Sequence, residues 1–123
     1  TLLWVYLVNA VLVIVHEIDS AYWQEWKLFH LPGGIGGFLL LHLPLVGVIL
    51  YGLVLVERQA TAGLVVALLL SAGGLFAFGI HTAFLLAGHP EFKLPVSLVL
   101  LALILLVSLV QGFVTLRDWR KEG

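Results

Sequence analysis

Three histidines stand inside three separate apolar stretches of the chain, and each is a residue type that does chemistry. His16 is followed directly by a carboxylate, and His42 and His81 lie in the next two stretches. Polar groups are costly among lipid tails, so in such segments they mark a working site or a bound cofactor. Three imidazoles and a carboxylate suit Zn²⁺, or non-haem iron or manganese at a higher coordination number. The predicted metal ligands are His16, Glu17, Asp19, His42 and His81.

The three histidines share one depth if each stretch is a membrane-spanning helix. At ~1.5 Å per residue, His16 lies roughly 9–12 Å inside the end of its helix. Counted from the same face, His42 lies about eight residues in and His81 about seven. The last apolar stretch offers only leucine and alanine at that level. We therefore expect the three rings to converge in one pocket, with the last helix as an apolar wall.

The carboxylates of the first stretch point in different directions. His16 and Asp19 are three residues apart and share a helical face, whereas Glu17 points about 100° away from His16. Either acid is a candidate for the anionic ligand, and the spare acid would orient an imidazole.

Haem is an alternative cofactor. Two histidines at equal depth on different helices, His42 and His81, are able to clamp a b-type haem. We rank haem below a non-haem metal, because an axial pair needs neither Glu17 nor Asp19 nearby. The small residues that would make room for the ring are Gly37, Gly73, Gly74 and Gly79.

The composition predicts the elements that must position these groups. Of 123 residues, 62% are hydrophobic and only 11% are charged, whereas soluble domains carry about 25% charged residues. This balance indicates an integral membrane protein. The absence of cysteine excludes thiolate metal sites and disulfides, and a net charge of -1 without a basic block argues against nucleic acid as a partner.

Four apolar stretches are each close to the ~20 residues that a helix needs to cross a bilayer. The chain therefore predicts an all-α, integral membrane four-helix bundle with short loops, in one domain spanning residues 1–123. Residues 22–34 hold two tryptophans, a tyrosine and mixed charges, which is typical of a short interfacial segment. Glu25, beside Trp26 and Lys27, is assigned to this interfacial belt. The expected helices are 2–21, 35–56, 62–87 and 96–116.

Lysine and arginine predict the orientation. One face carries Arg58, Arg117, Arg120 and Lys121, and the other carries Lys27 and Lys93. The positive-inside rule then places both termini in the cytoplasm. The lipid bilayer is the expected partner, and further membrane subunits or a second copy of the chain stay open.

The run His16-Glu17-Ile18-Asp19, followed by YWQEW and then by His42, resembles small bacterial four-helix membrane proteins of the HXXEE type. In the resemblance, Asp19 supplies the acid at the third position, and Ser20 stands where a second acid is expected. The resemblance implies the same bundle in a bacterial inner membrane, and it implies no activity.

These observations predict a membrane-embedded metal-binding protein with its site in the outer half of the bilayer. Metal-assisted hydrolysis or oxidation of a lipid-like substrate fits that location, and whether the protein is an enzyme stays open. Two alternatives remain: a non-catalytic accessory subunit of a larger membrane complex, and a b-type haem electron carrier.

Overall fold

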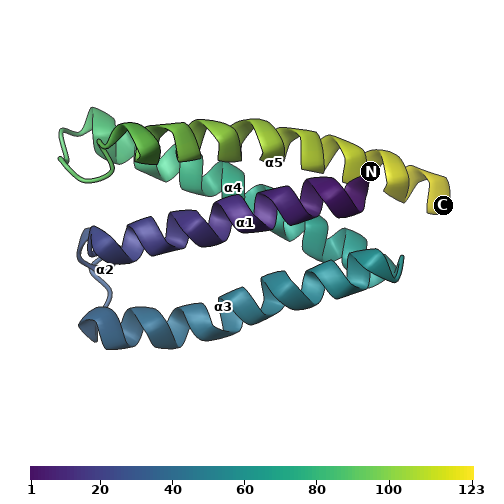
Figure 1. The fold of residues 1–123 in the computed structure, drawn as a ribbon, viewed down its shortest axis with the longest axis horizontal. Helices are drawn as coiled ribbons and strands as arrows, with labels where there is room; N and C mark the ends of the chain where they lie inside the picture. Colours follow the sequence, from purple (N-terminus) through teal and green to yellow (C-terminus); the bar gives the residue numbers. More distant parts are fainter.

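The computed structural model describes residues 1–123 and is all-α (Figure 1). Four of its five helices are long and apolar enough to cross a membrane, which confirms the predicted four-helix membrane bundle. The fifth is a single interfacial turn between the first two spans. The helices are α1 Leu2–Tyr22, α2 Glu25–Leu28, α3 Gly34–Glu57, α4 Thr61–Leu86 and α5 Pro95–Glu122.

The helix ends lie within one residue of the predicted positions except at the C-terminus. There α5 continues to Glu122 instead of ending near residue 116. The extension is charged apart from Trp119, and its last turn carries Arg120 and Lys121. Cations at a helix C-terminus interact favourably with the helix dipole, and no glycine or proline interrupts the segment, so the helix outlasts the apolar stretch.

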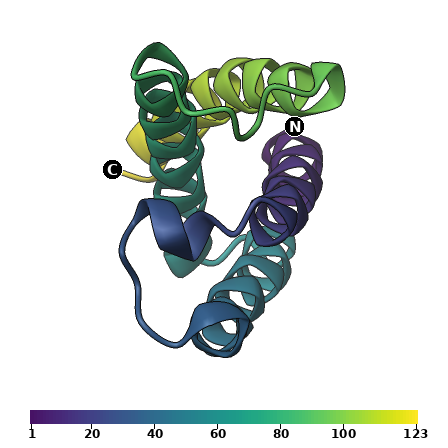
Figure 2. The same cartoon turned by 90° about the vertical axis from the view of Figure 1, so that its left-hand side faces the viewer.

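The four long helices are arranged as a ring in which each packs against two neighbours (Figure 2). Going round the ring, α1 packs on α5, α5 on α4, α4 on α3, and α3 on α1. The helices α3 and α5 lie diagonally opposite and do not touch, whereas α1 and α4 make limited contact across the middle. This arrangement leaves α5 outside the space enclosed by α1, α3 and α4.

A polar layer joins α1, α4 and α5 inside the bundle. The Asn9 amide donates to Gln111 Oε1 at 3.0 Å and to Ser108 Oγ at 3.2 Å. The Gln111 amide in turn donates to the Ala67 carbonyl at 2.7 Å, and the Ser71 hydroxyl donates to the Ser108 carbonyl at 2.6 Å. Membrane helices gain no hydrophobic driving force from one another, so such interhelical hydrogen bonds help to set which helices pair.

Apolar packing holds the other half of the ring. A cluster of buried side chains from α1, α3 and α4 surrounds Tyr6, whose hydroxyl donates to the Ile49 carbonyl at 2.7 Å. Close approach of the backbones depends on small residues. At Gly63, for example, a Cβ atom would lie 2.8 Å from the Leu55 backbone. The helices α3 and α4 are thus tightly packed near the turn that joins them.

Candidate functional site

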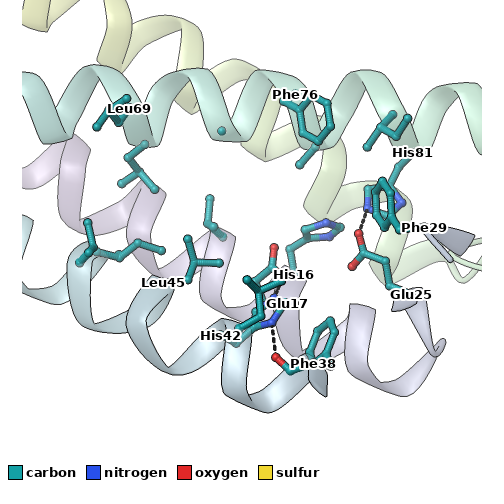
Figure 3. Close-up of a pocket in the computed structure, with 18 of the residues that line it drawn as sticks. His16, Glu17, Glu25, Phe29, Phe38, His42, Leu45, Leu69, Phe76 and His81 are labelled. Carbon is teal, nitrogen blue, oxygen red and sulfur yellow. Dashed lines mark hydrogen bonds and ion pairs between the residues drawn. The ribbon is translucent and has the colours of Figure 1, made fainter. Parts of the chain in front are cut away.

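A cavity of about 310 Å³ lies between α1, α3 and α4, with α2 closing one end (Figure 3). Sixteen of its 22 lining residues are hydrophobic, and none comes from α5. The prediction of α5 as an apolar wall of the site is therefore wrong, because α5 packs behind α1 and α4 and never faces α3. The charged or imidazole side chains in the lining are His16, Glu17, Glu25, His42 and His81.

The cavity opens toward lipid between α3 and α4. Val48 on α3 lines it and is 53% exposed, and Leu69 and Phe76 on α4 line it and are 63% and 64% exposed. These residues belong at once to the inner wall and to the outer apolar surface of the bundle. A molecule in the cavity is thus in contact with the acyl-chain region of a surrounding bilayer.

His42 and Glu17 form the first polar pair, between α3 and α1. His42 Nε2 lies 2.5 Å from Glu17 Oε2, and His42 Nδ1 lies 2.7 Å from the Phe38 carbonyl oxygen. A carbonyl only accepts, so Nδ1 carries a hydrogen and donates it. The contact between Nε2 and the carboxylate then holds one proton, which either partner is able to carry. The imidazole also stacks on the Phe38 ring with centroids 3.7 Å apart.

His81 and Glu25 form the second pair, between α4 and α2. His81 Nε2 lies 3.5 Å from Glu25 Oε1, and the His81 side chain is 1% exposed. Burial on its own raises the pKa of Glu25, but the His81 imidazole, the Ser20 hydroxyl and the nearby His16 lower it, so that the pKa lies below its usual range. The carboxylate is therefore held in its charged form at the end of the cavity that α2 closes.

His16 is placed against His81 without a hydrogen-bonding partner. The two rings meet edge to face with centroids 4.6 Å apart. His16 Nδ1 and both ring nitrogens of His81 make no hydrogen bond, although both side chains are almost fully buried. Buried polar atoms are nearly always paired, so these unpaired nitrogens are unusual. They are themselves buried, and a ligand in the cavity reaches them only if the rings turn toward it.

Phe92 covers the two buried histidines from the connection between α4 and α5. Its ring centroid lies 4.2 Å from that of His81 and 5.9 Å from that of His16, and the side chain is 1% exposed. Its backbone is left-handed, with φ of 65°, which is unfavourable for a bulky residue. Burial of the ring over the imidazoles accompanies this conformation, and nothing in the sequence signals it.

The histidines assemble as the depth count predicted, because His16, His42 and His81 all line one cavity. Glu17 joins them. Asp19 does not line the cavity, and it accepts a hydrogen bond from Trp23 Nε1 at 3.0 Å. Glu25, assigned from the sequence to the interfacial belt, lies in the site instead. The closeness of Glu25 to His16 in the sequence could have indicated this placement, because only a short turn separates the end of α1 from α2.

The residues are arranged as two histidine–carboxylate pairs with one further imidazole, and no three His, Asp or Glu side chains are grouped around a single point that could hold a metal ion. Binding of a metal by these ligands stays a prediction, as does haem between His42 and His81. The other two histidines, His30 and His89, lie in connecting segments, and His89 Nδ1 is 3.8 Å from the carboxylate of Glu91.

Residues 2–118 match a protein family described as a family of unknown function (DUF6713). No curated protein and no solved structure matches the chain.

Proposed function

Since the chain belongs to this family of unknown function, we propose its function from the geometry: it binds a lipid-like molecule within the membrane, with the polar head at the histidine–glutamate pairs and the tail toward the opening between α3 and α4. The supporting observation is that one cavity combines a polar part, at the histidine–glutamate pairs, with an apolar part that opens between α3 and α4. Its walls are apolar and open to lipid, and its titratable side chains all face the same space. An amphiphile complements both parts.

The orientation of the site belongs to the same proposal. Four of the six lysines and arginines lie on the face of the termini, at Arg58, Arg117, Arg120 and Lys121. The positive-inside rule then puts the termini in the cytoplasm and the histidine–glutamate pairs in the outer half of the bilayer. The resemblance to small bacterial membrane proteins supports placement in an inner membrane.

Filling the cavity tests the proposal. Gly73 lines the cavity, and a Cβ atom there would meet nothing within 4 Å. A Gly73→Leu variant should therefore occupy the cavity without disturbing the backbone. Gly79 lies on the same helix, is equally open and does not line the cavity, so Gly79→Leu is the matched control.

The probe is a hexadecyl alcohol with a photoactivatable diazirine in its chain, applied to protein in nanodiscs. Wild type and Gly79→Leu should be crosslinked at cavity-lining positions of α3 and α4, and Gly73→Leu should lose most of this crosslinking. Equal crosslinking in Gly73→Leu, or uniform crosslinking of every lipid-facing helix, would count against the proposal.

Metal binding is the second candidate function. The observation that favours it is the set of unpaired ring nitrogens on His16 and His81, beside the Glu25 carboxylate. Elemental analysis of the purified protein should then find about one zinc, iron or manganese per chain. The metal should be lost in His81→Gln and kept in His89→Gln; a protein without stoichiometric metal contradicts this candidate. An accessory role in a larger complex stays a prediction.

A further inference from the structure

The charge of the cavity limits the head group that it is able to accept. Two glutamates and three histidines line it, and no lysine or arginine does. An anionic head would be buried beside carboxylates without a fixed cation, which is costly. Phosphate-headed lipids and ionised fatty acids are therefore poor ligands, and a neutral head is favoured.

The hydrogen-bonding groups call for oxygen atoms on the ligand. The Glu25 carboxylate is able to accept from a hydroxyl. The His81 imidazole is buried behind it and makes no hydrogen bond, so it is able to donate to a carbonyl that enters between His81 and Glu25. The contact between His42 and Glu17 holds one proton that either partner is able to carry. Both walls are thus suited to a head that occurs with hydroxyl oxygens in one form and carbonyl oxygens in another.

The shape of the polar end points to a ring. Glu17 and His42 come from α1 and α3, whereas Glu25 and His81 come from α2 and α4, and Figure 3 shows the two pairs on different walls. A head between them meets polar groups on two sides. Aromatic side chains are among the other lining residues, and such side chains favour stacking and edge contacts with a flat ring. These aromatic residues are Trp26, Phe29, Phe38 and Phe76.

We infer, on the basis of the proposed function, that the ligand is a ring-headed lipid with oxygen atoms at opposite ring positions, that is, a quinol or quinone with an alkyl or isoprenoid tail. Its two oxygens lie toward the two histidine–glutamate pairs. A cavity of about 310 Å³ holds the ring and the first part of a tail, and the rest of the tail passes between α3 and α4 into the bilayer.

The experiment compares four probes with the same ten-carbon tail in protein-loaded and empty nanodiscs: decyl-1,4-benzoquinol, decyl-1,4-benzoquinone, decylbenzene and decanoic acid. Retained ligand is quantified by chromatography, and the excess over empty nanodiscs gives the affinity. The quinol and the quinone should bind about tenfold more tightly than decylbenzene, since decylbenzene lacks the hydrogen-bonding oxygens.

Variants then separate the head contacts from the cavity. Glu17→Gln and Glu25→Gln should each weaken quinol binding by about tenfold while leaving decylbenzene binding unchanged, which also shows that the cavity is intact. Glu91→Gln removes a carboxylate that does not line the cavity and should change neither. Gly73→Leu should reduce binding of all ring-headed probes.

Two outcomes overturn the inference in distinguishable ways. Equal affinity for quinol and decylbenzene, or tighter binding of decanoic acid, excludes the ring-headed oxygen ligand and leaves the lipid-binding function standing. Failure of every probe to bind in excess of empty nanodiscs, or binding that Gly73→Leu does not reduce, removes the proposed function together with the inference.

Discussion

At the scale of single residues, each side chain in the cavity takes its role from the residue that faces it from another helix. Glu25 illustrates this. In the chain it stands among interfacial tryptophans, yet in the structure its carboxylate lies 3.5 Å from the buried His81 imidazole. The contact ties the short α2 helix to α4 at the closed end of the cavity. Asp19 shows the reverse, since its nearest partner is the indole of Trp23 on its own helix end.

Acid should weaken this contact in a defined direction. The pKa of Glu25 is lowered in the folded protein from an ordinary value of 4.5, with burial opposed by His81 and the other neighbours. A lowered pKa contributes stability above the ordinary value, and that stability is lost as the pH falls through the folded value. The melting temperature of wild type should therefore exceed that of Glu25→Gln at pH 6, and the difference should shrink below pH 4.5. A difference that is constant or grows with acid would contradict this assignment.

At the scale of elements, the cavity exists because α3 and α4 are close at one end and apart at the other. Near their connecting turn, Gly63 lets the α4 backbone approach Leu55 on α3. Farther along, the facing positions are occupied by exposed apolar side chains such as Val48 and Phe76. Two helices that diverge from a tight turn leave a wedge-shaped space, and α2 closes its wide end.

Alanine at two glycines of α4 should therefore have opposite effects. At Gly63 a Cβ atom would lie 2.8 Å from backbone atoms of Leu55, so Gly63→Ala should lower the free energy of unfolding; a clash of this kind costs about 1–3 kcal/mol. At Gly73 the new methyl group meets nothing within 4 Å, and Gly73→Ala should be neutral or stabilising, by up to about 1 kcal/mol. Unfolding in mixed micelles measures both. Similar changes for the two variants would show that close packing near the turn does not hold the pair together.

At the scale of the whole molecule, the bundle combines two kinds of interior. A hydrogen-bonded layer of Asn9, Ser108 and Gln111 joins α1 to α5. The Gln111 amide also donates to the Ala67 carbonyl on α4. The other side of the ring, formed by α1, α3 and α4, contains the cavity. The Asn9, Ser71, Ser108 and Gln111 side chains are thus paired on one side. On the other side, three buried ring nitrogens of His16 and His81, which line the cavity, have no hydrogen-bonding partner.

The proposed orientation predicts which ends of the helices are accessible. The chain contains no cysteine, so single cysteines report their positions without background. In intact cells, a membrane-impermeant maleimide should label His89→Cys and should not label Ala60→Cys or Glu122→Cys until the membrane is opened. Labelling of Glu122→Cys in intact cells would invert the orientation and move the site to the inner half of the bilayer.

Much of the site was within reach of the sequence because helix geometry is regular. A fixed rise per residue converts position in an apolar stretch into depth, and this predicted that His16, His42 and His81 would share one pocket. They line one cavity, but His42 does not meet the other two rings. The pairing of these rings could not be predicted, because it depends on how each helix is rotated about its own axis, and packing against neighbours decides that rotation. The positions of Glu25 and Phe92 were out of reach for a related reason, since the paths of connecting segments follow no period.

The sequence by itself determined the class of the molecule, its four spans and the common depth of its histidines, because hydropathy and the length of a spanning helix are set by the bilayer and not by the partner helices. Only the tertiary structure decided that α5 lies outside the cavity, that Glu17 pairs with His42 and Glu25 with His81, and that the space between them opens to lipid. Those features depend on which helices are neighbours. Small residues and interhelical hydrogen bonds choose the neighbours, and they act only when distant parts of the chain come into contact.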